Sequence, residues 1–488
     1  MEEVVESYRA AGQSSVLRFL DELSAAERLE FLAQLSAYDP HELNRLFERF
    51  GKPTEGTAGA LDEADLAPLD ADDCGSALSA SAVDMQRYWD RGLKAVADGE
   101  LAVVVLAGGQ GTRLGSDKPK GTLPLGLLED PAQSLLERQA AQICKVTQLA
   151  RSRHPHSRAD IQWLVMTSAA TRQQTAEHLE RVVLPRCDAA LLSWQNTLLF
   201  EQAQLPAFRH DGRLLLDRPG RLFTAPDGNG GVYAALKPLL PRLAARGTRY
   251  VHFYCVDNVL CRVADPHFLG FAIERGADCV AKVVEKTDAE EAVGVVCRST
   301  RTGTPLVVEY SELPARLAAA RDPQDNRRLA FRAGNIANHL FTLDFLQRVC
   351  GDATAAKTLP YHAARKKIPF VDESGERVAP TTPNGVKLEQ FIFDVFQHSQ
   401  RFAVWEVGRE TEMSPLKNAE SAGRDCLTSC RRDLWRLHAQ WLRDARVRAL
   451  RQPELGVEVP VRVSYGGEGL SELVAGKEFD CPVVIDKD

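Results

Sequence analysis

Residues 101–115 read LAVVVLAGGQGTRLG, and residues 119–121 add Pro-Lys-Gly. An unbroken apolar run leads into a glycine-rich turn that contains one cation, Arg113, and precedes another, Lys120. A short apolar run that ends at glycines predicts a buried strand. Glycines let successive backbone N–H groups face an anion, and the two cations add fixed positive charge. The stretch therefore predicts a phosphate-binding loop at the end of a strand.

Two common phosphate-binding patterns do not fit this loop. The chain lacks the GxxxxGK[ST] string of a P-loop. The dinucleotide pattern GxGxxG also fails, because one residue too many separates Gly111 from Gly115. On this stretch alone, a strand-to-helix turn that uses glycine only for its geometry remains an alternative.

The rest of the chain predicts an α/β fold. From Leu101 onward short apolar runs alternate with segments of helical periodicity, which indicates a mixed, largely parallel sheet. Ligands bind such sheets at the carboxyl ends of the strands. We expect a helical N-terminal region over residues 1–95, a catalytic domain over 96–400 and a small α+β C-terminal domain over 401–488. A Gly/Ala/Asp-rich linker is expected between about residues 51 and 75.

Composition excludes several classes of protein. The 488 residues are 44% hydrophobic and 26% charged, with a formal net charge of −7, which argues against a nucleic-acid or anionic-membrane partner. No apolar stretch approaches the roughly 18–20 residues of a membrane span, and the first residues do not resemble a signal peptide. The 11 cysteines are scattered, as expected for free thiols in a reducing compartment. We expect a cytoplasmic protein; its oligomeric state, including a homo-oligomer, stays open.

LAGGQGTRLG followed by PKG is specific in combination, and it resembles the signature of nucleotidyltransferases that make nucleotide sugars. Further motifs follow in order and resemble the eukaryotic UDP-N-acetylhexosamine (UDP-N-acetylglucosamine) pyrophosphorylases: APDGNGG (225–231), YCVDN (254–258), VGVVCR (293–298), VVEYSE (307–312), AGNIANH (333–339), PNGVKLEQFIFD (383–394) and SPLKNAE (414–420). The resemblance covers roughly residues 90–480. It implies a central Rossmann-like nucleotidyltransferase domain. Arg332, before AGNIANH, departs from the asparagine of many relatives.

The resemblance also implies a reaction. Family enzymes join UTP to N-acetylglucosamine 1-phosphate and release pyrophosphate, with Mg²⁺ (or Mn²⁺) shared among phosphate oxygens. The work of the protein is then positioning and charge neutralisation. Three alternatives stay open: use of N-acetylgalactosamine 1-phosphate as well, a uridylyltransferase for glucose 1-phosphate or several sugar phosphates, and a catalytically weak paralogue that binds nucleotide sugar and acts through protein partners.

Site residues carried over from the family fall into four groups. The catalytic cations are Arg113, Lys120 and Lys387. The nucleotide group is Gly108, Gly109, Gln202, Asp227, Gly228 and Asn229. The sugar group is Gly294, Glu309, Gly334, Asn335, Phe391 and Phe393. Asp257 is the expected metal ligand, and Lys417 is a further phosphate contact.

Each of these residues has a plainer interpretation when it is taken alone. DGNGG is a strong turn former, and a glutamine such as Gln202 usually lies at the surface. Asp257 or Asn258 could cap a helix. Phenylalanines at alternating positions are usually core residues, and an isolated lysine is usually solvated.

Overall fold

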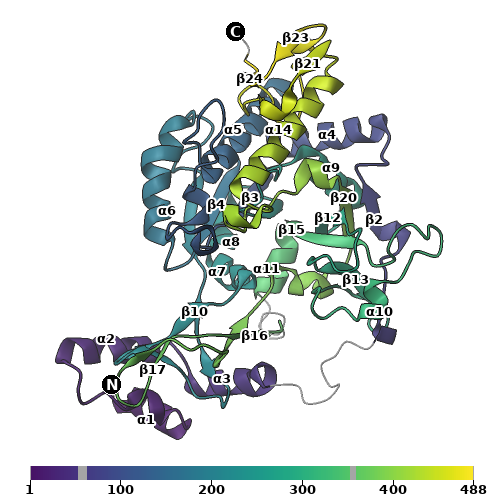
Figure 1. The fold of residues 1–488 in the computed structure, drawn as a ribbon. Coiled ribbons are helices and arrows are strands. Elements are labelled where there is room, and N and C mark those ends of the chain that lie inside the picture. Colours follow the sequence, from purple (N-terminus) through teal and green to yellow (C-terminus); the bar gives the residue numbers. More distant parts are fainter. Residues whose placement is uncertain (1, 53–62, 352–358, 487–488) are drawn as a thin grey trace. The chain divides into compact units, whose positions relative to one another are not determined.

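The computed structural model describes residues 2–52, 63–351 and 359–486; positions 53–62 of the predicted linker lie outside this range. The chain forms two compact units, and each unit is assembled from three separate segments (Figure 1). The smaller unit contains Met1–Ala60, Gln202–Ala235 and Ala353–Asp394. The larger unit contains Leu61–Glu201, Leu236–Asp352 and Val395–Asp488. The three predicted domain ranges are not tested by this division and stay a prediction.

An 11-stranded sheet forms the centre of the larger unit. Its main path runs in the order β2 (Cys74–Ser76), β20 (Phe402–Val407), β12 (Cys279–Glu285), β15 (Ala333–Thr342), β11 (Tyr250–Cys255), β3 (Leu101–Leu106), β4 (Gln162–Thr167) and β5 (Thr197–Glu201). Neighbours along this path are parallel except at β15, which is antiparallel to both β11 and β12. The predicted mixed, largely parallel sheet is confirmed.

Three further strands extend the sheet beside β15. They are β1 (Leu66–Ala67), β13 (Val295–Ser299) and β14 (Pro305–Val308). β13 pairs antiparallel with β14 and meets β15 through Val295 and Gly334. This extension places two of the predicted sugar-binding motifs, VGVVCR and AGNIANH, next to each other.

Burial explains why the central strands carry no polar alternation. Every residue of β3 and β4 is buried, as expected for strands that are covered on both faces. The covering helices include α4 (Ala82–Ala97), α5 (Leu135–Arg153) and α9 (Pro266–Arg275). α4 and α9 approach so closely that a Cβ at Gly92 would lie only 1.9 Å from the carbonyl oxygen of Pro266. Glycine thus permits backbone contact between two helices.

The last part of the larger unit is small and irregular. The helix α14 (Leu427–Asp444) precedes two parallel pairs, β21 (Ala449–Arg451) with β23 (Glu478–Asp480) and β22 (Val457–Glu458) with β24 (Val483–Val484). The remaining helices of this unit are α6 (Arg172–His178), α8 (Leu240–Ala245), α10 (Ala315–Ala318), α11 (Leu343–Gly351), α13 (Arg409–Glu412) and α15 (Leu470–Val474).

The smaller unit packs N-terminal helices against strands from later in the chain. α1 (Glu2–Ala10), α2 (Ala25–Ser36) and α3 (Pro40–Leu46) share a core with the sheet β16 (His362–Lys366), β19 (Gly385–Glu389) and β7 (Phe208–Arg209). Its other elements are β6 (Gln204–Pro206), β8 (Leu216–Arg218), β9 (Arg221–Leu222), β10 (Thr224–Pro226), β17 (Phe370–Val371), β18 (Arg377–Val378) and α7 (Val232–Leu236). The N-terminal helices cannot complete a core without these strands.

Candidate active site

The glycine-rich loop leaves the carboxyl end of β3 and is held by its own backbone. The N–H of Gly111 donates to the carbonyl of Lys118 (2.9 Å), and the N–H of Lys120 donates to the carbonyl of Gly109 (3.1 Å). The hydroxyl of Ser168, just beyond β4, donates to the carbonyl of Gly108 (2.8 Å). The loop is therefore a pre-formed feature at the end of the parallel strands, where anions are expected to bind.

Lys120 and Asp257 form an ion pair at this edge. The Nζ of Lys120 lies 3.0 Å from an Oδ of Asp257, and both side chains are about one-sixth exposed, at 16% and 17%. The pair arises from topology, because β3 and β11 are parallel neighbours and Leu106 lies opposite Cys255. Residues that follow these two strands must meet at the same edge. The helix-cap alternative does not describe Asp257, since α9 is capped by Asp265, which accepts from the N–H of His267.

Two further predicted cations are exposed in the same unit. Arg113 lies on a short 3-10 turn, Thr112–Leu114, within the glycine loop. Lys417 follows Leu416, whose N–H donates to the carbonyl of Asp257 (2.8 Å). Burial raises the pKa of the Cys255 thiol to about 12; the Asp257 carboxylate adds to this shift, and the ammonium groups of Lys417 and Lys120 oppose it. Both lysines therefore lie close enough to the end of β11 to interact electrostatically with the thiol of Cys255.

The predicted sugar residues of the larger unit also gather in one place. The N–H of Asn335 donates to the carbonyl of Gly294 (2.8 Å). A Cβ at Gly294 would lie 3.0 Å from an Oε of Glu309, so this carboxylate lies directly over the glycine. Gly334 pairs with Val295 across β15 and β13. The structure thus brings together Gly294, Glu309, Gly334 and Asn335, a set that we name the sugar cluster.

In the smaller unit the DGNGG turn and Gln202 form a second group. The amide nitrogen of Gln202 donates to the carbonyl of Gly228 (3.1 Å), and its side chain is buried rather than at the surface. Burial raises the pKa of Asp227 to about 6, and a hydrogen bond from Gln202 opposes that shift. Gly228 has φ +89°, and a Cβ there would lie 2.3 Å from the carbonyl oxygen of Gln390. Only glycine fits this position.

The same turn holds the segment that carries the two predicted phenylalanines. The side-chain oxygen of Asn229 accepts from the N–H of Ile392 (2.9 Å). The rings of Phe391 and Phe393 have centroids 5.1 Å apart; Phe391 is half-buried and Phe393 is buried. Lys387, on β19, lies with its Nζ 5.4 Å from the ring centroid of Phe223, and burial lowers its pKa. Lys387 is therefore not a fully solvated lysine.

Two residues that the sequence analysis did not assign to the site support it directly. Asn258 clamps the chain after Asp257: its amide nitrogen donates to the carbonyl of Glu412 (2.7 Å), and its amide oxygen accepts from the N–H of Ser414 (2.9 Å). His339 contacts Asn335 through a hydrogen bond of 3.0 Å. Both residues lie within the family motifs YCVDN and AGNIANH. Membership of these motifs is the sequence signal that could have identified them as site residues. Their contacts depend on tertiary structure.

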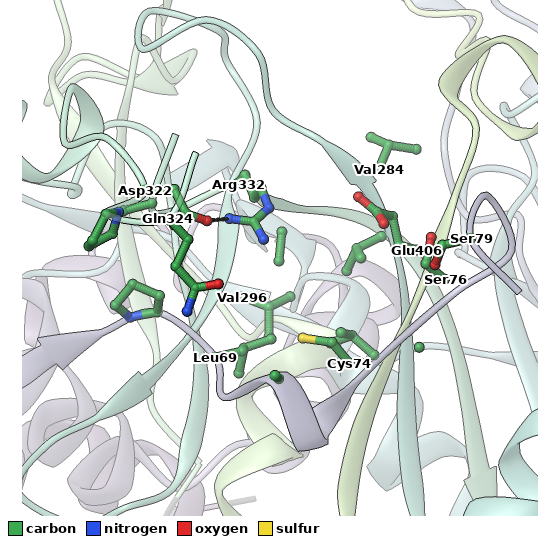
Figure 2. A pocket seen from close by; sticks show the side chains of 18 residues that line it. Leu69, Cys74, Ser76, Ser79, Val284, Val296, Asp322, Gln324, Arg332 and Glu406 are labelled. Atoms are coloured by element: carbon green, nitrogen blue, oxygen red, sulfur yellow. Dashed lines mark hydrogen bonds and ion pairs between the residues drawn. The ribbon is translucent and has the colours of Figure 1, made fainter. Parts of the chain in front are cut away.

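A cavity of about 430 Å³ lies elsewhere in the larger unit (Figure 2). Its wall includes Cys74 beside β20 and Arg332, whose guanidinium donates to Asp322 (2.6 Å), shown as the dashed line. None of the predicted site residues lines it. Arg332, the departure noted in the sequence, thus lies in this wall, immediately before β15.

The residues present suit a magnesium ion that is shared with substrate. Among the described residues no group of three or more His, Cys, Asp or Glu side chains could hold a metal alone. Mg²⁺ is often bound by one or two carboxylates together with phosphate oxygens, and Asp257 offers one carboxylate beside the phosphate loop.

Within the described residues 2–52, 63–351 and 359–486, no helix is long and apolar enough to cross a membrane.

Comparison with known proteins agrees with this arrangement. Residues 42–457 match the family model described as UTP–glucose-1-phosphate uridylyltransferase. A probable UDP-N-acetylglucosamine pyrophosphorylase of Caenorhabditis elegans is 44% identical over 95% of this chain and 92% of its own. UDP-N-acetylhexosamine pyrophosphorylase-like protein 1 of Homo sapiens is 41% identical over 98% of this chain and 96% of its own.

Solved structures extend the agreement to the fold. The uridine diphosphate N-acetylglucosamine pyrophosphorylase of Trypanosoma brucei, solved with an inhibitor, superposes with a TM-score of 0.80 at 30% identity, covering 96% of this chain and 94% of that one. The chain therefore belongs to the eukaryotic UDP-N-acetylhexosamine (UDP-N-acetylglucosamine) pyrophosphorylases, a branch of the uridylyltransferase family.

Proposed function

We propose that this enzyme transfers the uridylyl group of UTP to N-acetylglucosamine 1-phosphate, which yields UDP-N-acetylglucosamine and pyrophosphate. One observation carries the proposal: Lys120 and Asp257 meet at 3.0 Å beside a folded glycine loop. A cation for phosphate and a carboxylate for a divalent ion are the two charges that phosphoryl transfer requires. The sugar cluster in the same unit supplies polar groups for the acceptor substrate.

The chemistry needs no covalent intermediate on the protein. A phosphate oxygen of the sugar substrate attacks the α-phosphorus of UTP, and the bond to the β-phosphate oxygen breaks. Arg113 and Lys120 hold the triphosphate and balance the charge that develops on the pyrophosphate, while Lys387 and Lys417 neutralise the remaining phosphate oxygens. Mg²⁺ (or Mn²⁺), held by Asp257 and phosphate oxygens, supplies additional neutralisation when bound.

The turn in the smaller unit suits uracil. The amide nitrogen of Gln202 is used by Gly228 and Asp227, which leaves its amide oxygen as an acceptor. The N3–H of uracil needs such an acceptor. Gly108, Gly109 and the Asp227–Asn229 turn would approach the nucleotide through backbone groups. Phe391 and Phe393 offer an apolar wall for the acetyl group of the sugar.

Pyrophosphate release tests this function. The purified enzyme is supplied with UTP, Mg²⁺ and one of three acceptors: N-acetylglucosamine, N-acetylgalactosamine or glucose 1-phosphate. Turnover with the acetamido sugars and little with glucose supports the proposal, and their ratio gives the preference that depends on one hydroxyl group. Equal or better turnover with glucose 1-phosphate would replace it by the broader sugar-phosphate activity. Binding without turnover would indicate the catalytically weak paralogue.

The free thiols support a reducing compartment. All 11 cysteines are free in the structure, and seven of them are buried. Free thiols at this frequency are typical of a reducing environment. We infer that the enzyme works in the cytoplasm on small-molecule substrates, without nucleic-acid or membrane partners.

A further inference from the structure

β15 contains an irregularity at the sugar cluster. Lys282 of β12 pairs with Asn338, but the next residue, Val283, pairs with Asn335. Two residues, Ile336 and Ala337, therefore have no partner on β12, and Ala337 adopts φ +50°. In a regular strand, side chains four positions apart would be separated by about 13 Å. This bulge instead folds Asn335 back toward His339.

The contacts at Asn335 settle which way its amide points. Its Oδ1 accepts from the backbone N–H of Ala337 (3.2 Å), and the Nε2 of His339 lies 3.0 Å from the same atom. A peptide N–H can only donate, so the atom between them is the oxygen, and His339 must donate to it as well. The assignment is thus fixed by chemistry rather than by the similar shapes of oxygen and nitrogen.

The histidine can supply that donor in only one form. His339 is fully buried, and burial lowers its pKa to about 3, with the nearby His252 adding to the shift. The ring is therefore neutral and carries one proton. Its Nδ1 has no hydrogen-bond partner in the described parts of the chain, so the proton belongs on Nε2. The ring itself is fixed between Phe341 and Phe396, at 5.9 and 4.9 Å between centroids.

We propose that His339 is a positioning residue of the sugar subsite: it holds the amide oxygen of Asn335 inward and so presents the amide N–H₂ to an acceptor oxygen of the sugar phosphate. The inference rests on the proposed function. Asn335 is half-buried, and its backbone is tied to Gly294 beside Glu309. The acceptor is either the acetamido carbonyl or a ring hydroxyl, which share the same hydrogen-bond chemistry.

A second histidine–asparagine pair, His252 of β11 and Asn338 of β15, provides a matched control. The Nδ1 of His252 accepts from the N–H of Ala264 (3.2 Å), so its Nε2–H donates to the amide oxygen of Asn338 (2.7 Å). The amide nitrogen of Asn338 is also used, by the sulfur of Cys261 at 3.5 Å. Asn338 is buried, so its amide is not accessible to a substrate. Loss of His252 should affect stability without affecting sugar binding.

The test uses His339→Phe, which keeps a flat ring between two phenylalanines and removes the donor. We expect the KM for N-acetylglucosamine 1-phosphate and the Kd for UDP-N-acetylglucosamine, measured by calorimetry, to rise about tenfold, the size of one lost hydrogen bond. The KM for UTP and kcat should change less than about threefold. His339→Gln restores a donor at a similar reach and should recover most of the affinity. His252→Phe should lower Tm and leave both constants unchanged.

Coupling to Asn335 gives the decisive readout. In an Asn335→Ala background, His339→Phe should have no further effect on the sugar constants. Glucose 1-phosphate identifies the acceptor: the His339→Phe effect disappears with this substrate if the acetamido carbonyl is the partner and persists if a hydroxyl is. An unchanged Kd in folded His339→Phe, or an equal loss in the Asn335→Ala background, overturns the inference. If the wild-type enzyme binds UDP-N-acetylglucosamine but shows no turnover, the proposed catalysis is rejected. The Kd values of the His339 variants for UDP-N-acetylglucosamine still decide the role of His339 in that case.

Discussion

The ammonium group of Lys120 and the carboxylate of Asp257 lie 3.0 Å apart and neutralise each other's charge. A bound triphosphate and its cation would have to separate the pair, because each charge then gains a partner of its own. The sequence predicted both residues, one in the loop and one after a strand. It could not predict their contact, which depends on β3 and β11 being parallel neighbours although nearly 150 residues separate them.

Lys120→Ala should reduce kcat by about 10²–10³, because a cation aimed at the leaving pyrophosphate acts mainly in the transition state. Lys118→Ala is the matched control, since Lys118 lies two residues away in the same loop and is exposed. Steady-state kinetics with Tm as a folding check measure both variants. Equal kcat values for the two variants would remove Lys120 from the catalytic role.

Asp257→Asn should raise the Mg²⁺ concentration that gives half-maximal activity, because a neutral amide is a weaker ligand for a hard cation. The exposed loop residue Asp117 provides a control through Asp117→Asn. Magnesium titrations at fixed UTP would show the difference. Wild-type activity that survives excess chelator would contradict a metal role for Asp257.

Asp227 predicts a pH dependence of stability. Burial raises its pKa to about 6 from a usual value of 3.8, so the folded state binds this proton more tightly than the unfolded state. The contribution of protonated Asp227 to the free energy of unfolding is complete below about pH 4 and is lost as the pH rises through 6. Asp227→Asn should therefore raise the free energy of unfolding at pH 7, by at most about 3 kcal/mol, and flatten its change between pH 4 and 6.

Denaturant unfolding at several pH values measures this effect. The control is Asp211→Asn in the same unit, because the pKa of Asp211 is lowered and its contribution has the opposite sign. A free energy of unfolding that is the same for wild type and Asp227→Asn at every pH would show that Asp227 is ionised without cost.

Among the elements, the buried parallel strands were the most predictable. β3, β4 and β11 are nearly continuous apolar runs, and both their strand character and the position of the loop after β3 followed from the sequence. β15 was not predicted from pattern. Asn335, Asn338 and His339 interrupt its apolar residues, and these polar groups are accommodated by bonding to one another or to neighbouring strands. The family motif AGNIANH indicated sugar-binding residues here but predicted no strand.

The contact between α4 and α9 gives a prediction about packing. Gly92→Ala should lower the free energy of unfolding by about 1–3 kcal/mol, since the new methyl group would collide with the carbonyl of Pro266. This loss outweighs the roughly 1 kcal/mol that alanine normally adds in a helix. Gly351→Ala, at a site with no atom within 4 Å of the added carbon, is the control. Denaturation midpoints for the two variants test the difference.

For the whole molecule, the sequence indicated the α/β class and the helical start but not the division into units. The predicted boundaries follow the chain in order, whereas each compact unit collects three separate segments. Composition changes along a chain reveal consecutive domains; they do not reveal a unit whose segments are separated by more than 100 residues of another unit. The predicted site residues belong to both units, with Lys120 and Asp257 in the larger and Gln202 and Lys387 in the smaller.

This connectivity has a consequence for synthesis on the ribosome. Phe31 and Phe47 emerge early, yet the strands that bury them include Val386 and Leu388, near the end of the chain. The nascent helices must therefore remain with uncovered apolar faces during most of translation, a period in which exposed surface promotes aggregation. Chaperone demand for this protein should fall on its first fifty residues, and a ribosome stalled before residue 385 should hold them in a protease-sensitive state.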